Sequence, residues 1–439
     1  MKRIFPAFTY GPGPRQSCWW DETIDAPNWP CLSENKTADV AIIGAGFTGV
    51  SAALHLAQEG ASVAVLEAET PGWGASGRNG GFCCLGGSKL SSAQMEQRFG
   101  PEAARDFARA EVASVALVQS LLSRFSIDAD THSRGETILA HNARAMAGLR
   151  RTLQAGGIDG MELAERSELD DLGMSGPFHG ALTIPVGFGL NPRKYLFGLA
   201  DAAVQAGARI FQKSPATDVV RDAGQYRVTT PAGALRAENV LIATNGYSSE
   251  DIPEWMAARY LPAQSSVLVT QPLTQEEQQA QGWTSAQMAY DTRNLLHYFR
   301  LMPDGRFLFG MRGGLMSSAQ AEIAAQRRTR KDFERMFPAW AHVPSPHRWS
   351  GMVCLARNRV PFVGPIREKP GLFAGFAYHG NGVAMGSYAG RLLADLALNR
   401  PPEVPYPIMM RQPPPRFPLG RTRRLLMPPL YAALTLADL

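Results

Sequence analysis

Three glycines and one acidic residue have the spacing of a nucleotide-binding turn. Gly44, Gly46 and Gly49 follow the apolar run 40–43, and Glu67 comes 18 positions after Gly49. Gly44 permits a tight turn, Gly46 lets the backbone approach a pyrophosphate, and Gly49 lets a helix pack closely on a strand. The start of that helix offers free N–H groups to phosphates, and Glu67 can accept hydrogen bonds from ribose hydroxyls. The pattern predicts a dinucleotide site without separating FAD from NAD; the alternative is a glycine-rich turn without a ligand.

A second glycine-rich stretch follows the acidic residue. Residues 73–81 contain four glycines in nine positions, together with Arg78 and Asn79. Such a stretch lets the backbone pass close to a large flat cofactor, and the two polar side chains can contact it. This favours FAD. The alternatives are a flexible surface loop and an NAD-dependent enzyme that shares only the first turn.

The elements that must position these turns begin with a strand–helix–strand unit. The runs 40–43 and 63–66 are typical of buried parallel strands, and the apolar residues between them have helical spacing up to Gly60. Such a unit is right-handed. Further helices are predicted at 102–125, 195–207, 319–336 and 385–398, and strands at 227–230, 240–243, 371–377 and within 134–190 and 260–315.

The composition excludes several classes of protein. The chain has 439 residues, 45% hydrophobic and 19% charged, which indicates a folded protein of two or three domains. Its net charge of +5 comes from scattered arginines, so we expect a solvated surface and no nucleic-acid partner. We expect no transmembrane segment, because there is no apolar run of about 18 residues, and no secretory signal. The five cysteines lack metal-like spacing, so we expect no metal site, no disulfide framework and a cytoplasmic location.

Five stretches of the chain resemble the D-amino-acid oxidase-like (DAO) family of FAD-dependent oxidoreductases. The similarity is greatest to its branch of gamma-glutamylputrescine oxidoreductase-like and L-pipecolate oxidase-like enzymes, whose hallmark is GASGRNGG. The stretches are ADVAIIGAGFTGVSAALHLA at 38–57, GASGRNGG at 74–81, VLIATNGYSS at 240–249, YFRLMPDGRFLFG at 298–310 and AGFAYHGNGVAMGSYAGRLLADL at 374–396.

This resemblance implies an α/β fold of two domains, a Rossmann-like FAD-binding domain and a substrate domain of mixed β-sheet and helices. The expected boundaries are an N-terminal arm at 1–36, a discontinuous FAD-binding domain at 37–125, 191–255 and 346–400, a substrate domain at 126–190 and 256–345, and a C-terminal tail at 401–439.

The resemblance also implies which residues contact FAD. They come from five places in the chain: Gly44, Gly46, Phe47, Thr48, Gly49; Glu67, Ala68; Gly74, Ala75, Ser76, Arg78, Asn79, Gly80, Gly81; Val219, Ala243, Thr244, Asn245, Gly246; and Gly380, Asn381, Gly382, Val383, Ala384. Many relatives have a histidine between two glycines in the last turn, where this chain has Asn381. An acid–base role for that turn is therefore in doubt.

Four residues are candidates for binding the substrate. Tyr378 and His379 precede the last glycine-rich turn, and the alternation of a strand puts Tyr298 and Arg300 on one face. Arg300 could bind a carboxylate with two parallel hydrogen bonds. The alternatives are a structural tyrosine and histidine, and a salt bridge. The thiols of Cys83, Cys84 and Cys354 are candidates for contact with the flavin, or else buried small hydrophobes.

We therefore expect an FAD-dependent enzyme that oxidises a CH–NH bond by hydride transfer, giving an imine that hydrolyses. A gamma-glutamylputrescine-like or secondary amine is favoured over a D-amino-acid or sarcosine-type substrate; a non-catalytic flavin-binding protein is the alternative of another class. No catalytic base is assigned. The turn at 382–385 has no lysine or arginine. We therefore expect slow reoxidation by oxygen and a preference for another electron acceptor, such as a quinone or a protein.

Overall fold

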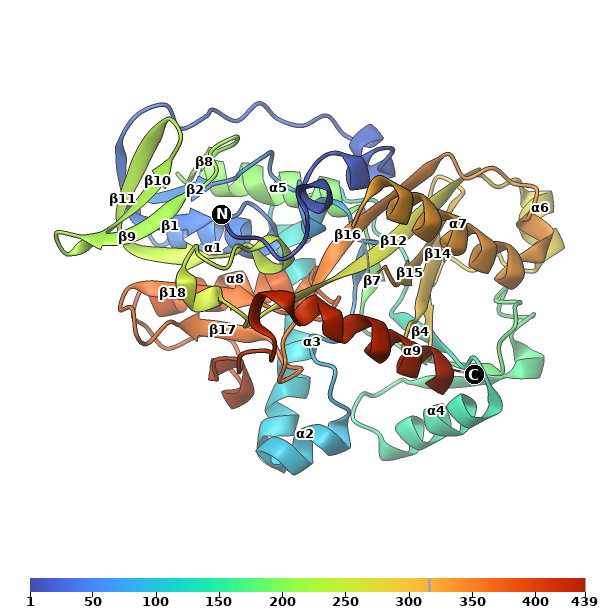
Figure 1. The fold of residues 1–439 in the computed structure, drawn as a ribbon. Helices are drawn as coiled ribbons and strands as arrows, with labels where there is room; N and C mark the ends of the chain where they lie inside the picture. The colour runs from blue at the N-terminus through green and yellow to red at the C-terminus, as the bar shows by residue number, and fades with distance from the viewer. Residues whose placement is uncertain (315–316, 439) are drawn as a thin grey trace.

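The computed structural model describes residues 1–314 and 317–438, which form two large β-sheets with helices around them (Figure 1). The first sheet has a parallel centre whose strands end in buried apolar residues, as in 40–43, 63–66 and 240–242. Its strand order is β17 (Phe362–Pro365), β18 (Leu372–Phe376), β11 (Gly233–Ile242), β1 (Lys36–Ile43), β2 (Val63–Leu66) and β8 (Arg209–Phe211), and a hairpin of β9 (Asp218–Asp222) and β10 (Gln225–Thr230) extends from β11.

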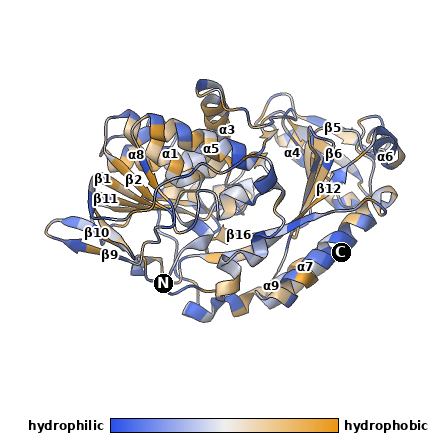
Figure 2. Cartoon of the chain, turned by 90° about the horizontal axis from the view of Figure 1, so that it is seen from above, coloured by the Kyte–Doolittle hydropathy of each residue, from blue (hydrophilic) through white to orange (hydrophobic). Residues whose placement is uncertain are grey.

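Helices cover one face of this sheet, as Figure 2 shows from above. They are α1 (Phe47–Gln58), α5 (Pro192–Gln205) and α8 (Ala384–Ala397), with α2 (Ser92–Phe99) and α3 (Pro101–Arg124) behind them. Gly390 of α8 allows close packing on α1, since a Cβ there would lie 2.5 Å from the Thr48 carbonyl oxygen. The Asn191 side chain accepts hydrogen bonds from two backbone N–H groups and caps α5.

The second sheet is mixed and carries an aromatic core on one face. Its order is β16 (His347–Leu355), β12 (Leu261–Pro272), β15 (Arg306–Arg312), β14 (His297–Leu301), β13 (Met288–Asp291), β4 (Glu136–Leu139), β6 (Gly180–Ile184) and β5 (Glu162–Glu165). Phe299, Phe307 and Trp283 of the core pack beneath α7 (Ala319–Met336). Helices α4 (Ala143–Ala155) and α6 (Gln275–Gln281) lie beside this sheet, and β3 (Phe82–Cys83) pairs with β7 (Phe188–Gly189).

Some sequence predictions need correction here. The stretch 134–190 contains the helix α4 as well as short strands, because Asn142 caps the helix and its apolar face, with Met146 and Leu149, packs against β6. The expected return to the first domain at 346 is too early, since β16 pairs with β12 in the second sheet. The chain rejoins the first sheet at β17.

The N-terminal segment is not a free arm. It forms three short 3₁₀ turns and buries Phe5, Tyr10 and Trp20 against the body of the molecule. The Trp20 indole N–H donates to the carbonyl oxygen of Asn79 at 2.8 Å. The segment therefore helps to hold the second glycine-rich stretch in place.

The C-terminal tail ends in α9 (Met427–Ala437), which crosses the front of the molecule in Figure 1. Met427 is buried against Leu261 and Ala263 of β12. The carboxylate of Asp438 accepts hydrogen bonds from the backbone N–H groups of Asn294 and Leu295. The tail is thus fastened to the second sheet.

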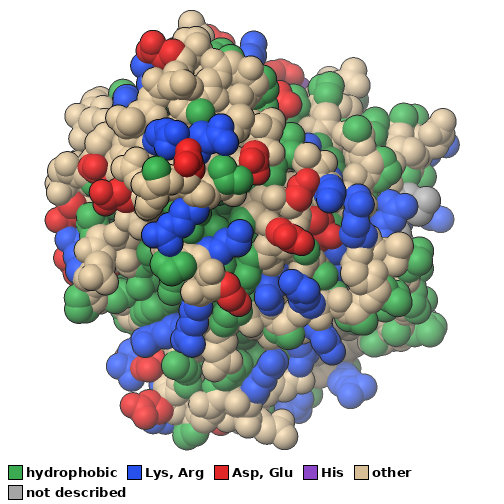
Figure 3. Space-filling view, turned by 60° about the vertical axis from the view of Figure 1, so that its left-hand side comes forward, with side chains coloured by type: hydrophobic (Ala, Val, Ile, Leu, Met, Phe, Trp, Pro, Cys, Tyr) green, Lys and Arg blue, Asp and Glu red, His purple; other side chains and the backbone are tan. Residues whose placement is uncertain are grey.

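On the face drawn in Figure 3, arginine and lysine are interspersed with aspartate and glutamate in the upper half and predominate in the lower half. Among the helices of the described residues, none is long and apolar enough to cross a bilayer.

Candidate functional site

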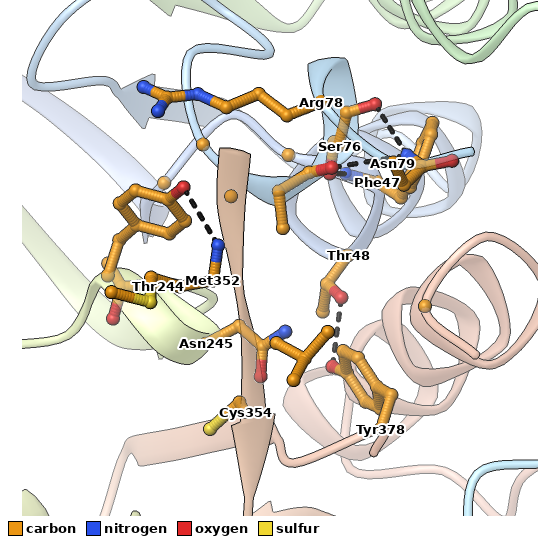
Figure 4. A pocket seen from close by; sticks show the side chains of 18 of the residues that line it. Phe47, Thr48, Ser76, Arg78, Asn79, Thr244, Asn245, Met352, Cys354 and Tyr378 are labelled. Atoms are coloured by element: carbon orange, nitrogen blue, oxygen red, sulfur yellow. Dashed lines mark hydrogen bonds between the residues drawn. The ribbon is translucent and has the colours of Figure 1, made fainter. Parts of the chain in front are cut away.

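A cavity of about 420 Å³ lies between the two sheets and opens at the carboxyl ends of β1, β2 and β11. Figure 4 shows its lining from close by. The described residues that line it come from both sheets, from the glycine-rich turns and from the N-terminal segment. Ligands of open parallel sheets bind at this end of the strands.

The first glycine-rich turn has the geometry that its sequence predicts. Gly44 has a φ of +104°, which favours glycine, and a Cβ there would lie 2.9 Å from the Ala243 carbonyl oxygen. A Cβ on Gly49 would lie 1.9 Å from the Gly44 carbonyl oxygen. Gly49 therefore fixes the approach of α1 to β1 without lining the cavity itself.

Gly46 lines the cavity, as does Gly44. A Cβ there would lie 2.8 Å from the Ser76 Oγ atom, which also accepts a hydrogen bond from the backbone N–H of Phe47 at 3.0 Å. The turn and the second glycine-rich stretch thus meet at the N-terminus of α1. This leaves a space beside the helix end that only a glycine keeps open.

Glu67 lies at the end of β2 and lines the same cavity. Its Oε2 accepts a hydrogen bond from the Ala45 N–H at 2.8 Å, and its Oε1 accepts one from the Glu69 N–H at 3.1 Å. Burial raises the pKa of this carboxyl above its usual value, and these hydrogen bonds offset only part of the rise. A carboxylate oxygen can accept more than one hydrogen bond, so Glu67 keeps capacity for ribose hydroxyls.

Arg78 is buried beside the second glycine-rich stretch. Its Nε donates to the Trp73 carbonyl oxygen at 2.7 Å, and its Nη1 to that of Ser350 at 3.3 Å, whereas its Nη2 is buried without a hydrogen-bond partner in the described residues. An unpaired buried guanidinium N–H is costly, and an anionic or carbonyl group bound in the cavity would satisfy it. The Gly46 cradle and this unpaired donor both fit a bound FAD.

Asn79 supports the loop from within. Its amide nitrogen donates to the carbonyl oxygens of Ala75 and Ser76, and its amide oxygen accepts from the Gly81 N–H. The predicted polar contact of Asn79 with the cofactor therefore competes with hydrogen bonds that shape the loop.

The last glycine-rich turn faces the cavity from the start of α8. Tyr378 and Thr48 share a hydrogen bond of 2.9 Å and point toward one another in Figure 4. The Asn381 amide nitrogen donates to the Leu85 carbonyl oxygen at 2.6 Å and lies 3.2 Å from the Cys84 sulfur. The asparagine therefore joins the turn to the segment after β3 and carries no titrating group.

The expectation that His379 binds substrate is wrong for this fold. Its side chain is 1% exposed and does not line the cavity. Its Nε2 accepts a hydrogen bond from the Ala356 N–H at 3.1 Å, and its Nδ1 donates to the Gly87 carbonyl oxygen at 2.9 Å. Burial lowers the pKa of His379 to about 4, so the imidazole is neutral and structural.

Arg300 does not reach the cavity either. Its Nε donates to the Gly80 carbonyl oxygen at 2.9 Å and its Nη2 to that of Leu190 at 2.7 Å, while its Nη1 lies 2.9 Å from the His132 Nε2. The side chain is 1% exposed. Arg300 therefore holds the second glycine-rich stretch against the second sheet. The prediction that Arg300 binds a substrate carboxylate is wrong for this fold. Tyr298, on the same face of β14, does line the cavity.

Arg312 was missed by the sequence reasoning and lies where Arg300 was expected to act. It ends β15, lines the cavity and donates from Nη2 to the His379 carbonyl oxygen at 3.1 Å. A Cβ on Gly380 would lie 2.4 Å from that Nη2. The argument that no cation lies near the last turn is therefore wrong, because a neighbouring strand supplies one. The only available signal was an arginine at the end of an apolar strand.

The other predicted residues divide according to whether they reach the cavity wall. Val219 lies in the β9–β10 hairpin, outside the lining, and Pro215 and Ala216 take its place. Gly81, Gly246 and Ala384 also lie outside the lining. The predicted residues in the lining are Gly44, Gly46, Phe47, Thr48, Glu67, Ala68, Gly74, Ala75, Ser76, Arg78, Asn79, Gly80, Ala243, Thr244, Asn245, Tyr298, Tyr378, Gly380, Asn381, Gly382 and Val383.

The cysteines are buried thiols where they approach the cavity. Cys84 and Cys354 line it and Cys83 does not. Burial raises the pKa of Cys354 to about 12 and that of Cys84 well above its usual range. In the described residues, no cluster of three potential metal ligands occurs.

Comparison with known proteins agrees with this geometry. Residues 39–396 match the model of the DAO family, described as FAD dependent oxidoreductase. The chain is 31% identical over 390 residues to a probable oxidoreductase OrdL of Haemophilus influenzae, covering 87% of this chain and 88% of that protein. It is 30% identical over 406 residues to gamma-glutamylputrescine oxidoreductase of Escherichia coli, covering 92% and 93%.

Solved structures have the same two-sheet fold. Glycine oxidase from Geobacillus kaustophilus matches with a TM-score of 0.70 and 21% identity, over 86% of this chain and 98% of that one. L-proline dehydrogenase from P. horikoshii matches with a TM-score of 0.69 and 18% identity, over 84% and 96%.

The fold is therefore a Rossmann-like FAD-binding domain joined to a mixed-sheet substrate domain, and the cofactor is FAD. The chain belongs to the DAO family of FAD-dependent oxidoreductases.

Proposed function

We propose that this enzyme oxidises the CH–NH bond of an amine or amino acid that also carries a carboxylate. The observation that carries the proposal is the position of Arg312, which lines the cavity beside the last glycine-rich turn. The printed names of the relatives, among them a gamma-glutamylputrescine oxidoreductase and glycine oxidases, support an amine substrate.

The residues of this chain have separate tasks in such a reaction. Gly46, Ser76 and Glu67 would hold the nucleotide half of FAD, and the turn from Gly380 to Val383 would lie beside its ring. Bound FAD supplies a two-electron acceptor for a hydride from the substrate carbon. Arg312 would bind the substrate carboxylate, and Tyr298 and Tyr290 would form the wall opposite the turn.

A gamma-glutamylputrescine-like or secondary amine is the substrate we favour. The gamma-glutamyl group of the former carries both an amino group and a carboxylate, so an arginine at one end of the cavity suits it. A small amino acid, as in the glycine oxidases, is the second candidate. We also propose a cytoplasmic location, since all five cysteines are free thiols.

Anaerobic bleaching of the flavin tests both the class and the substrate. The purified holoenzyme is mixed with gamma-glutamylputrescine, L-pipecolate, sarcosine, glycine and D-amino acids, and flavin absorbance is followed. Reduction by gamma-glutamylputrescine in preference to glycine is the expected result. If none of these compounds reduces the flavin, the proposed function is wrong, and a flavin-binding protein without amine oxidation becomes the better interpretation.

A further inference from the structure

A buried carboxyl group lies behind the wall of the cavity and makes none of the contacts described so far. Glu136, the first residue of β4, is 2% exposed. Its Oε1 accepts a hydrogen bond from the Tyr290 hydroxyl at 3.3 Å, and its Oε2 is buried without a hydrogen-bond partner in the described residues. A carboxyl group with one oxygen unpaired inside a protein is costly, so it calls for a function.

The register of two strands explains why Glu136 and Tyr290 meet. Parallel pairing puts Glu136 beside Met288 of β13, and Tyr290 follows two positions later on the same face. Tyr290 lines the cavity, as does Tyr298, which pairs with it on the neighbouring strand β14. Glu136 does not line it. The Tyr290 hydroxyl therefore lies between the cavity and the buried carboxyl.

The charged and titratable groups around Glu136 come from three directions. Cys84, with Cys83 next to it, faces it from the segment after β3, and Glu111 faces it from α3. The charge of Arg312 acts on Tyr290 from β15, two strands away in the same sheet. Lys89 and Arg312 both act on the Cys84 thiol.

Burial dominates the ionisation of Glu136. It raises the pKa of this carboxyl to about 8, the neighbouring Cys84 thiol and the Tyr290 hydroxyl oppose the rise, and the charge of Glu111 adds to it. Burial raises the pKa of Tyr290 well above its usual range, so this phenol stays protonated. A group that exists as both acid and base near neutral pH is suited to accept a proton during turnover.

We propose that Tyr290 and Glu136 form a proton relay that takes the proton from the ammonium group of the substrate before its oxidation. The inference rests on the proposed amine oxidation and deepens it. The substrate N–H bond breaks as that proton bonds to the Tyr290 oxygen. The Tyr290 hydroxyl proton moves to Glu136 Oε1 at the same time. The phenol stays neutral, the carboxylate becomes a carboxylic acid, and the amine nitrogen keeps the electron pair of the broken bond, which it needs to form the imine.

In this relay Tyr290 touches the substrate and Glu136 is a positioning residue that acts through it. A merely structural Glu136 would not create a pH dependence of amine oxidation. The relay predicts one, because Glu136 accepts a proton only when it is a carboxylate. Flavin reduction therefore becomes faster as the pH rises through about 8.

The kinetic test is the pH profile of flavin reduction by gamma-glutamylputrescine, measured anaerobically in single turnovers. In the wild type we expect the rate of flavin reduction to rise with pH around the pKa of Glu136, which gives the pH profile a limb there. Glu136→Gln and Tyr290→Phe each abolish that limb, leaving only the titration of the substrate amine, and slow reduction about 100-fold above it. Glu111→Gln is the matched control: its pKa is also raised by burial, to about 7, yet it does not touch Tyr290, so the limb remains.

A second readout needs neither substrate nor turnover. Because the pKa of Glu136 is raised in the folded state, the wild type loses stability progressively as the pH rises from the ordinary carboxyl range to about 8, where the loss is complete. Glu136→Gln has no such loss. The unfolding midpoint of the variant relative to the wild type should therefore increase from acid to alkaline pH, whereas a constant difference contradicts an ionising Glu136.

The outcomes separate the two proposals. No reduction by any amine overturns the proposed function and the relay with it. Reduction with a limb that persists in both Glu136→Gln and Tyr290→Phe, or that disappears in Glu111→Gln instead, overturns the relay alone. Tyr290→Phe decides the kinetic question if Glu136→Gln does not fold.

Discussion

Single residues at the cofactor end of the cavity act mainly through the space they leave free. Gly46 has no positive φ to explain it, but its missing Cβ keeps the N-terminus of α1 open beside Ser76. The same N-terminus offers unpaired N–H groups to a phosphate. The glycine spacing predicted this correctly from sequence, because the constraint is local to one turn.

Gly46→Val should abolish FAD binding, since even its Cβ would lie 2.8 Å from the Ser76 Oγ and its branches would occupy the space beside the helix end. The flavin content of the purified protein measures the effect. Gly148→Val is the control, because a Cβ at Gly148 in α4 meets only the Arg151 side chain, at 3.8 Å. Full flavin content in the Gly46 variant would contradict the assignment of this turn.

Residues that bind the substrate depend on which strand ends meet across the cavity. If Arg312 binds a carboxylate, Arg312→Lys should raise KM for gamma-glutamylputrescine by about tenfold or more, because an ammonium cannot replace a planar fork. The KM for putrescine, which lacks the carboxylate, should change much less. Steady-state kinetics with the two amines decide it, and equal effects on both would remove carboxylate binding from Arg312.

At the scale of elements, strand β14 shows why alternation alone misassigned a residue. The prediction that Tyr298 and Arg300 share a face agrees with the structure, since Tyr298 crowds Gly80 and Arg300 donates to the Gly80 carbonyl oxygen. Sequence could not indicate that the loop 80–81 and Leu190 lie against that face. These contacts join segments more than 100 residues apart.

Arg300→Lys should therefore weaken the attachment of the second glycine-rich stretch to the second sheet, and it should not weaken substrate binding. A lysine cannot reach the Gly80 oxygen, the Leu190 oxygen and His132 together, and each buried group left unpaired costs about 1–3 kcal/mol. We expect a lower midpoint of thermal unfolding and a lower flavin content, with the ratio of KM for gamma-glutamylputrescine and putrescine unchanged. Arg134→Lys, at an exposed position, serves as the control. A selective rise in KM for the carboxylate-bearing amine would return Arg300 to the substrate site.

At the scale of the molecule, the cofactor half of the site was predictable and the substrate half was not. The residues expected to contact FAD lie in short turns whose glycines are constrained by their own neighbours, so sequence order nearly gives spatial order. The opposite wall is assembled from β13, β14 and β15 with the segment after β3. There, strand pairing within the second sheet brings Arg312, Tyr290 and Glu136 together, and Lys89 joins them from the segment after β3.

The same assembly changes the expectation for the electron acceptor. Slow reaction with oxygen was expected because the turn at 382–385 carries no cation, but Arg312 reaches His379 beside that turn and Lys89 also lines the cavity. Positive charge near reduced flavin stabilises the negative charge that develops on oxygen. We now expect reoxidation by oxygen to keep pace with turnover.

Lys89 is the cation to test, because Arg312 is already engaged with the His379 carbonyl oxygen. Lys89 is exposed to the cavity, and its enclosure there together with the charge of Arg312 lowers its pKa well below the usual range, so its positive charge disappears as the pH rises through that lowered pKa. Reoxidation by oxygen should slow over the same pH interval.

The Lys89→Met variant should be reoxidised about tenfold or more slowly than the wild type at low pH, and its reoxidation rate should not depend on pH in this interval, while flavin reduction by amine is unaffected. Stopped-flow mixing of the reduced enzyme with air-saturated buffer measures this, with Lys369→Met, at an exposed position, as the control. Reoxidation that stays slow in the wild type, or a pH dependence that persists in Lys89→Met, would show that these cations do not serve oxygen and would restore a quinone or a protein as the acceptor.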